Sequence, residues 1–274
     1  YLERIFETID EPVTVKDAED AVSMPKIRGK VTFDHVQFAY DDTKTILKDV
    51  SFTVNPGESV ALVGPTGAGK STIVNLISRF YNVNGGRVLI DDQDISRVTI
   101  HSLRSQMGIM MQDSFIFSGT IEDNIRYGKL DATREEIVKA SKIVCVDEFI
   151  TKMKDGYDTE VRERGSMLSQ GQKQLISFAR TLLSDPAILI LDEATSSIDV
   201  QTEKALQTGL NAMLDGRTSF IIAHRLSTIR NCDKIMYIDA GGIMETGTHE
   251  ELMAKKGYYY RLYTAQLDDI QTAG

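Results

Sequence analysis

The chain has 274 residues, 42% hydrophobic and 26% charged, so it is long enough to bury a core and has the composition of a folded domain rather than a disordered or fibrous chain. Its formal net charge of −9 argues against a general nucleic-acid binder, because such proteins carry clustered basic residues that release counterions from phosphates. The two cysteines, Cys145 and Cys232, form no CxxC pair, which excludes a zinc site built from cysteines alone and fits a reducing compartment.

Residues 1–28 are predicted to form a linker ahead of the globular domain. A helical pattern over residues 1–10 runs into acidic residues and then Pro25, and no basic region followed by an apolar stretch marks a secretion signal. No apolar run in the sequence approaches the roughly 20 residues that a membrane-spanning helix needs. Because residue 1 is Tyr and not Met, we expect a piece cut from a longer polypeptide.

Two kinds of apolar pattern follow along the chain. Alternating apolar residues over 31–40 and 50–54 predict half-buried antiparallel strands. Later apolar runs are continuous, as in strands of a parallel sheet that is covered on both faces. These runs lie at 60–63, 187–191 and 219–223. Residues 113–183 show helical spacing instead.

These patterns predict an α/β fold organised as one domain over residues 29–267. Its expected core is a mostly parallel sheet, with an antiparallel β subdomain on the N-terminal side. A helical subdomain is expected to be inserted over about 113–183. Residues 268–274 are expected to form a C-terminal tail.

A phosphate-binding loop is the strongest local pattern. Residues 64–71 read GPTGAGKS and fit G-x-x-x-x-G-K-[ST], after a predicted strand and at the start of a helix predicted over 70–80. In such a loop the glycines let backbone amides surround phosphate oxygens, while Lys70 reaches the outer phosphates and Ser71 offers a hydroxyl to Mg²⁺. A plain strand-to-helix turn with spare glycines is the alternative, and the flanking elements count strongly against it. We therefore predict a P-loop NTPase core, with nucleotide contacts from Gly64, Pro65, Thr66, Gly67, Ala68, Gly69, Lys70, Ser71 and Thr72.

Carboxylates and an imidazole follow two of the buried runs. Asp192 ends the run 188–191, at the sheet edge where ligands of open α/β sheets bind, and can hold Mg²⁺ there. Glu193 is then placed to orient or deprotonate a water that attacks the γ-phosphate. The alternative is that both carboxylates only favour the start of the next helix. His224 follows the run 219–223 and is either a packing or capping residue or a contact to the γ-phosphate or the attacking water.

The start of the helix after residue 169 is a second candidate anion site. Ser169 and Gln172 match a capping box, which leaves backbone amides exposed from Ser169 to Gly171. Because the phosphate loop already surrounds its own nucleotide on one side, we expect this helix start to contact a nucleotide held by another copy. An ordinary capped helix is the alternative, and it would be favoured if the motif stood alone.

Taken in order, these motifs resemble those of the nucleotide-binding domain of ATP-binding cassette (ABC) exporters of the bacterial multidrug or lipid half-transporter type. The resemblance covers nearly the whole chain. The matching segments are the phosphate loop at 64–71, the signature at 168–172, the second nucleotide motif at 188–192 and the switch histidine, His224. Segments 114–121 and 160–165 also look like exporter features.

The resemblance implies roles for residues that the local patterns do not single out. It implies that Tyr40 stacks on adenine, that Gln112 joins Mg²⁺ and the attacking water to the transmembrane contact, and that Asp199 crosses the dimer interface. The implied catalytic residues are Glu193, His224, Lys70 and Gln112. The implied metal ligands are Ser71, Gln112 and Asp192. The implied contacts of the signature side to the opposite nucleotide are Ser169, Gln170, Gly171, Gln172 and Asp199.

The resemblance further implies an ATPase that uses ATP and Mg²⁺ to drive export. Two such domains are expected to close head to tail around two ATP molecules, one or both of which are hydrolysed, on the cytoplasmic face of the cell membrane. Expected partners are a transmembrane domain of the same polypeptide and a second nucleotide-binding domain, identical or different. Gln170 and Arg162 depart from the common pattern, which has glycine in both places. Because a side chain at 170 would crowd the second nucleotide, we hypothesise a different partner chain with one degenerate site.

Three other classes share parts of this pattern. DNA-repair and chromosome-organising ATPases insert a long coiled coil or zinc modules before the signature, and neither heptads nor paired cysteines occur here. A nucleotide sensor that binds without cleaving would not need both Glu193 and His224. A GTPase is least supported, because no N-K-x-D motif is present to read guanine.

Overall fold

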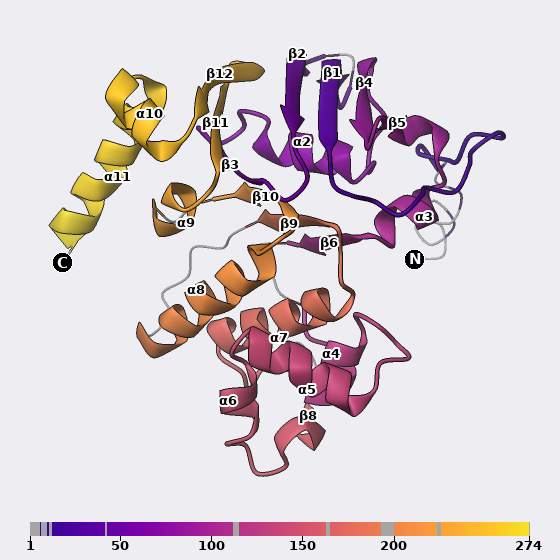
Figure 1. Cartoon of the computed structure of the whole chain (residues 1–274), viewed down its shortest axis with the longest axis vertical. Helices are drawn as coiled ribbons and strands as arrows, with labels where there is room; N and C mark the ends of the chain where they lie inside the picture. Colours follow the sequence, from indigo (N-terminus) through magenta and orange to yellow (C-terminus); the bar gives the residue numbers. More distant parts are fainter. Residues whose placement is uncertain are drawn as a thin grey trace.

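The computed structural model describes residues 6, 10, 13–41, 43–111, 115–162, 165–192, 200–223 and 226–273, with their side chains except those of 200, 201 and 268–273. Two β-sheets form one part of the molecule and a group of helices forms another, as Figure 1 shows. Helix α2 (Lys70–Ile77) lies between the two sheets. This arrangement confirms the predicted α/β class.

The antiparallel sheet forms from strands in which apolar and polar residues alternate. Four described strands pair in the order β2-β1-β4-β5. Their bounds are β1 Val31–Ala39, β2 Thr45–Val54, β4 Gly85–Ile90 and β5 Gln93–Asp94. In β1 the apolar spacing lengthens from two residues to three between Phe33 and Val36, and a bulge with His35 at φ 52° takes up the extra residue. As a result, one face of the strand keeps its apolar residues buried on both sides of the bulge.

The second sheet is mostly parallel, as predicted. Six described strands pair in the order β12-β11-β3-β10-β9-β6, and only the β11–β12 pair among them is antiparallel. Their bounds are β3 Ser59–Val63, β6 Met107–Met110, β9 Ile188–Asp192, β10 Thr218–Ile222, β11 Lys234–Asp239 and β12 Gly242–Gly247. Every residue of β3 and β10 is buried, as expected for strands covered on both faces.

Two hydrophobic clusters cover the two faces of this parallel sheet. Val60 and Leu62 of β3 belong to the cluster that surrounds α2 and the antiparallel sheet. Ala61 and Val63, which alternate with them, belong to the cluster that joins the sheet to the helical region. The core therefore has two layers with β3 at their boundary.

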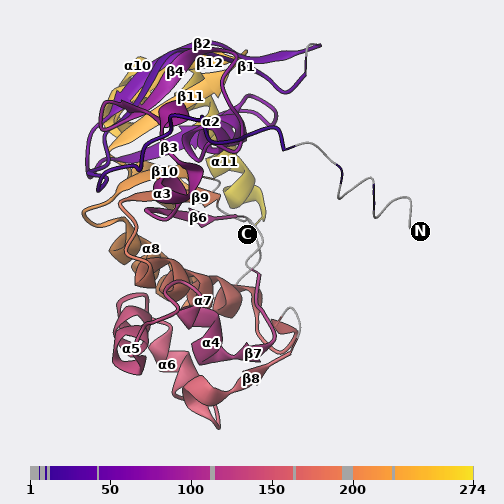
Figure 2. The same cartoon turned by 90° about the vertical axis from the view of Figure 1, so that its right-hand side faces the viewer.

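The helical region occupies the end of the molecule away from the antiparallel sheet (Figures 1 and 2). Its helices are α4 Ile121–Arg126, α5 Arg134–Ile143, α6 Asp147–Ile150 and α7 Gln170–Leu183. Helix α8 (Val200–Leu214) packs against α7. The helices α4, α5 and α7 each begin at a capping box, which satisfies amides that a helix start leaves unpaired. Two short strands, β7 (Gly119–Thr120) and β8 (Glu160–Val161), pair within this region and were not predicted.

The helix predicted over 70–80 is three residues shorter than expected. It ends at Ile77, because Arg79 adopts a left-handed backbone conformation with φ 51°, which an α-helix cannot contain. The remaining helical elements are η1 Ile95–Arg97, α3 Ile100–Arg104, η2 Gly156–Asp158, α9 Leu226–Arg230, α10 His249–Lys255 and α11 Tyr258–Ala273. None of the helices in the described part of the chain combines enough length with enough apolar character to cross a bilayer.

Segments near both ends of the described chain pack onto the core. Met24 and Ile27 are buried, so packing begins ahead of Gly29, inside the segment that we expected to be a linker. At the other end α11 runs on to Ala273, into the segment expected to be a tail. Tyr259 at its start is fully buried, and its hydroxyl lies 2.8 Å from Nδ1 of His249.

Candidate active site

The carboxyl ends of four neighbouring strands meet at one edge of the parallel sheet. The register pairs Ile222 of β10 with Asp192 of β9, and Met110 of β6 with Leu191. On the other side of β10, Ile222 pairs with Leu62, two residues before the phosphate loop begins. This common edge brings the loop after β3 and the carboxylate of Asp192 to one place.

The backbone of the phosphate loop depends on its glycines. Gly64 has φ 137°, and a Cβ atom on it would lie 2.1 Å from the carbonyl oxygen of Ile238. The loop therefore leaves β3 in close contact with the neighbouring strand β11, where only glycine fits. Gly67 and Gly69 also have positive φ, and Gly69 forms the N-cap of α2. The loop turns its chain directly into a helix start, as the sequence predicts for an anion site.

Lys70 is the cation of this loop. Its Nζ donates hydrogen bonds to the carbonyl oxygens of Gly64 and Pro65, both at 2.8 Å, so the side chain folds back over the loop. Burial lowers the pKa of the Lys70 ammonium, and the negative charge of Asp192 opposes this effect. Lys70 therefore lies within electrostatic reach of the carboxylate on the neighbouring strand end.

The residues expected to hold Mg²⁺ fit that ion in their chemistry. Ser71 is exposed on the first turn of α2 and offers a hydroxyl oxygen, and half-buried Asp192 offers carboxylate oxygens. Both are hard oxygen donors of the kind that Mg²⁺ prefers. Thr72, the next residue of α2, is buried instead and its Oγ1 lies 3.1 Å from the hydroxyl of Tyr40.

An aromatic wall stands beside the start of α2. Tyr40 follows β1, is 49% exposed, and is tied to α2 through Thr72. Its ring packs edge-on against Phe38 at 4.8 Å and against Tyr81 at 4.9 Å between centroids. The sequence reasoning overlooked Tyr81, although an exposed aromatic pair directly after the phosphate-loop helix, Phe80 and Tyr81, is a usable signal. These contacts fix the orientation of the Tyr40 ring while leaving it accessible to solvent.

The signature segment forms the start of α7 in the helical region. The predicted capping box is confirmed, because Ser169 N donates to Gln172 Oε1 at 3.0 Å and Gln172 N donates to Ser169 Oγ at 3.3 Å. Ser169 and Gln170 are exposed and Gly171 is buried. Among the described residues, no hydrogen bond links this helix start to the phosphate loop of the same chain. The structure thus brings Lys70, Ser71, Tyr40 and Asp192 to one region and leaves residues 169–172 outside it.

Four expected site residues, Gln112, Glu193, Asp199 and His224, lie outside the described residues. Described neighbours of three of them lie at the carboxyl edge of the sheet: Met111 precedes Gln112, Asp192 precedes Glu193 and Ala223 precedes His224. Met111 and Asp192 also line a small cavity of about 20 Å³ together with Gln174 and Phe178 of α7. This cavity lies between α7 of the helical region and the sheet edge.

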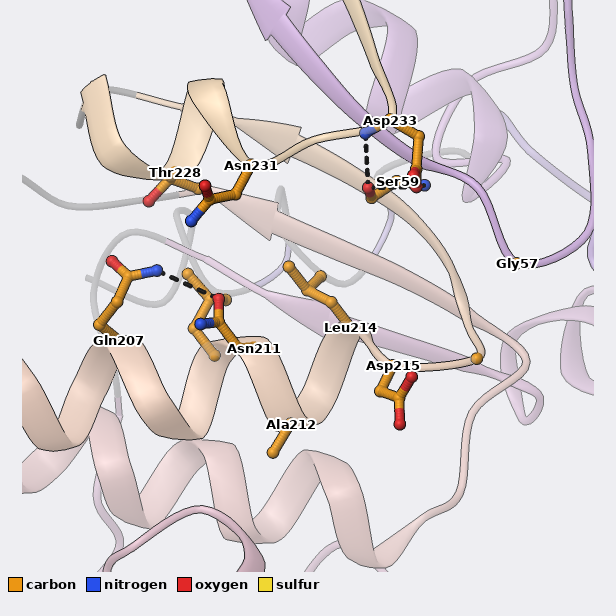
Figure 3. Close-up of a pocket in the computed structure, with 12 residues that line it drawn as sticks. Gly57, Ser59, Gln207, Asn211, Ala212, Leu214, Asp215, Thr228, Asn231 and Asp233 are labelled. Atoms are coloured by element: carbon orange, nitrogen blue, oxygen red, sulfur yellow. Dashed lines mark hydrogen bonds between the residues drawn. The ribbon is translucent and has the colours of Figure 1, made fainter.

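A larger cleft lies at the opposite end of the sheet and is a separate feature. It has a volume of about 690 Å³ and opens between α8 and the segments that precede β3 and β11 (Figure 3). Its polar groups bond to one another: Gln207 Nε2 donates to Asn211 Oδ1 at 3.2 Å, and Asp233 accepts from both the amide and the hydroxyl of Ser59. Its lining contains none of the residues that the sequence predicts as nucleotide contacts.

Comparisons with known proteins agree with this geometry. A family model described as ABC transporter matches residues 47–196, more than half of the chain. The chain is 54% identical over 264 residues to an uncharacterised ABC transporter ATP-binding protein of Bacillus subtilis, with 96% of this chain and 44% of that protein covered. It is 47% identical over 263 residues to a fatty acid ABC transporter ATP-binding/permease protein of Mycobacterium bovis, covering 96% of this chain and 41% of that protein.

A solved structure shows the same fold. It is described as a bacterial Atm1-family ABC exporter with ATP bound, and it superimposes with a TM-score of 0.89 at 45% identity. The match covers 97% of this chain and 46% of the exporter chain. This chain therefore spans less than half the length of the relatives it matches. It belongs to the ABC transporter family, as a nucleotide-binding domain of the exporter type.

Proposed function

We propose that this chain binds ATP with Mg²⁺ and hydrolyses it, and that this hydrolysis drives the export of a substrate. The observation that carries the proposal is the meeting of the glycine loop, Lys70 and Asp192 at one edge of the parallel sheet. A loop of amides, a cation and a metal-binding carboxylate together match the charges of a magnesium triphosphate.

Lys70 exchanges partners when ATP binds. Its Nζ donates hydrogen bonds to the carbonyl oxygens of Gly64 and Pro65. The β- and γ-phosphates offer stronger, charge-assisted acceptors at the same place, so Lys70 turns from its own backbone to the phosphates. Tyr40, held by Thr72 and Tyr81, keeps its exposed ring in place for the adenine base.

Ser71 and Asp192 would hold Mg²⁺, with Gln112 as a third ligand. The ion neutralises charge on the phosphate oxygens when bound. Glu193, directly after Asp192, orients and deprotonates the attacking water, and His224 keeps the γ-phosphate and this water in line. Lys70 then offsets the charge that develops on the phosphates during transfer.

The start of α7 serves a nucleotide held by a second nucleotide-binding domain. Its capping groups are satisfied within the chain, and Ser169 and Gln170 are exposed, which supports a head-to-tail pair with two ATP molecules. The amides of Gln170 and Gly171 complete the site of the opposite chain, and Asp199 crosses the interface. Hydrolysis removes the γ-phosphate that bridges the two chains, so the pair reopens.

The membrane part of a longer polypeptide is the proposed second partner. The relatives whose names include permease are more than twice as long as this chain. An exposed aromatic surface on the helical region supports a docking place there: Phe115 is 52% exposed and Tyr127 is 59% exposed. Phe117 stacks on Tyr127 at 4.6 Å, with the guanidinium of Arg180 over the Phe117 ring. Such a patch is unusual on a free surface. Accordingly, we place the chain at the cytoplasmic face of the membrane.

Two substitutions test the enzyme proposal. Glu193→Gln should lower ATP turnover about 100-fold or more, because a general base contributes that much, while ATP stays bound and the dimer is trapped more readily. Lys70→Ala should instead weaken binding of Mg-ATP roughly 10-fold or more, because a charge-assisted contact is lost. Phosphate release, equilibrium binding and size in Mg-ATP measure these effects. Unchanged turnover in Glu193→Gln would remove it from the base role, and undiminished binding in Lys70→Ala would contradict the loop assignment.

A further inference from the structure

Arg79 is a buried cation that the nucleotide site does not use directly. Only 3% of its surface is exposed, and it lies two residues after the end of α2. Its Nη1 donates to the carbonyl oxygen of Val98 at 2.6 Å, and its Nη2 donates to the carbonyl oxygen of Lys16 at 2.9 Å. A single guanidinium thus joins the phosphate-loop helix to a segment more than sixty residues earlier in the sequence.

Residues 16–27, which we call the N-terminal strap, are held along this side of the core. Val22 forms a parallel bridge with Val98, and the amide of Ile100 donates to Oδ1 of Asp17 at 2.7 Å. Farther along, the amide of Met24 donates to the hydroxyl of Ser102 at 2.8 Å. Figure 1 shows this segment, drawn in indigo, running beside α3. These contacts of the strap fall within residues 98–102, a segment to which Arg79 also donates a hydrogen bond, at Val98.

A second arginine, Arg104 at the end of α3, and an acid of the strap, Asp17, lie beside the end of α2. Arg104 Nε donates to the carbonyl oxygen of Ser78 at 3.0 Å, and its Nη2 donates to that of Arg79 at 2.8 Å, which satisfies carbonyls that the helix end leaves unpaired. The two guanidinium groups repel each other, and burial together with the charge of Arg79 lowers the pKa of Arg104. Asp17 opposes this effect and lies 3.8 Å from Nη1 of Arg79. The strap thus supplies the negative charge that the two arginines share.

We infer that Arg79 is a positioning residue through which the N-terminal strap sets the placement of the phosphate-loop helix, and with it Lys70 and Ser71. The inference rests on the proposed ATP site, because it concerns the affinity of that site. Helix α2 has eight residues and is about 12 Å long. A shift of its carboxyl end therefore also shifts its first turn, which carries Lys70 and Ser71. If the strap is displaced, Arg79 loses both Lys16 and Asp17 and stays buried without them, which is costly.

The test compares two ways of breaking the contact in the 274-residue chain. One variant is Arg79→Met, and the other lacks residues 1–18, which removes Lys16 and Asp17 but keeps Val22, Met24 and Ile27. We expect each to weaken Mg-ATP binding roughly 5-fold or more, the usual lower range of coupling between sites. A variant that combines the substitution and the deletion should bind Mg-ATP no more weakly than either alone, because both changes break the same contact between Arg79 and the strap. Arg79→Lys, which keeps the charge and a donor, should restore part of the affinity.

A matched control breaks a different contact of the same strap. Arg97 and Asp20 form an ion pair in which both side chains are largely exposed, so Arg97→Met should leave Mg-ATP affinity unchanged. Hydrogen exchange of the ligand-free chain gives a second readout, in which the backbone amides of α2 should exchange faster in both variants and not in the control. If Arg79→Met does not fold, the deletion and the exchange measurement decide the question.

The outcomes separate this inference from the proposed function. If the unmodified chain does not bind Mg-ATP, the proposed function fails, while the exchange of α2 amides still tests the strap. If the chain binds Mg-ATP and the two variants bind it equally well with unchanged α2 exchange, the inference is overturned. Effects that add in the combined variant would also overturn it, since they would show that Arg79 does not act through the strap.

Discussion

The phosphate-loop side and the signature side of this domain are built in different ways. The loop leaves a fully buried strand, touches its neighbour β11 at Gly64, and folds Lys70 back onto its own backbone. At the start of α7, Ser169 and Gln170 are exposed, and the capping box satisfies the amides of Ser169 and Gln172. In the core, the groups proposed to bind nucleotide also hold the chain together. In the helical region, Ser169 and Gln172 cap the helix, whereas Gln170 is exposed outside the capping box.

This difference predicts how each side responds to substitution. A change in the loop should affect both the stability of the fold and the affinity for ATP, because the same backbone serves both. A change at Gln170, outside the capping box of α7, should affect assembly in ATP with little change in stability. The following substitutions test this contrast from both sides.

The largest effect is expected from Gly64→Ala. The new Cβ would meet the carbonyl oxygen of Ile238 at 2.1 Å, and the φ of 137° is unfavourable for any residue with a side chain, so β3 and β11 must separate. We expect a loss of several kcal/mol in the free energy of unfolding, together with loss of Mg-ATP binding. Thermal or denaturant unfolding and equilibrium binding measure the two effects.

Gly67→Ala is the matched control for that change. Gly67 also has a positive φ, of 80°, but a Cβ there would have no neighbour within 4 Å. It should cost only the backbone strain, about 1–2 kcal/mol. Equal destabilisation by the two substitutions would show that contact with Ile238 does not hold the loop.

Much of the core site can be predicted from the sequence because its pattern is local. The glycine spacing, the buried strand before it and the carboxylate that ends β9 all lie within short segments whose geometry follows from chain chemistry. The capping box of α7 was predictable for the same reason. The fold class could also be predicted, because a strand buried on both faces has a continuous apolar run and a strand buried on one face has an alternating one.

Features that depend on distant contacts were not predictable. The length of α2 was overestimated, because apolar spacing continues past Ile77 while the left-handed conformation of Arg79 does not show in the sequence. The packing of residues 16–27 was missed because Met24 and Ile27 are buried by residues about eighty positions away. The pairing of β7 with β8 joins segments of two residues each, too short for any periodicity.

A smaller effect is expected from pH, and it tests the position of Lys70. Burial lowers the pKa of Lys70 below the ordinary 10.5, so in the ligand-free fold this ammonium loses its proton earlier than an exposed lysine as pH rises. Because only the charged form pairs with the phosphates, Mg-ATP affinity should fall with rising pH and begin to fall below 10.5.

The contribution of Lys70 to the stability of the ligand-free chain should change in the opposite direction. Because the pKa of Lys70 is lowered in the folded state, the unfolded chain binds more protons over this pH interval. The free energy of unfolding therefore increases as the pH rises. The difference between the chain and Lys70→Ala, measured by denaturant unfolding and by binding across the alkaline range, isolates both trends. An affinity that falls with pH equally in Lys70→Ala would mean that another group is responsible.

The smallest effect on the fold is expected at Gln170, on the signature side. Its side chain is exposed on the first turn of α7, and the capping box of Ser169 and Gln172 does not include it. Gln170→Ala should therefore change the free energy of unfolding by only a few tenths of a kcal/mol, and Gln170→Gly should cost about 1 kcal/mol because glycine lowers helix propensity.

If the side chain crowds the nucleotide of the opposite chain, both variants should dimerise more tightly in Mg-ATP than the unmodified chain does. Dimerisation can be measured by sedimentation after Glu193→Gln is added to the unmodified chain and to each Gln170 variant. The alanine variant separates the loss of side-chain bulk from the loss of helix propensity. Unchanged dimerisation in both variants would leave Gln170 a surface residue, and the contrast between the two sides would then rest on the capping box alone.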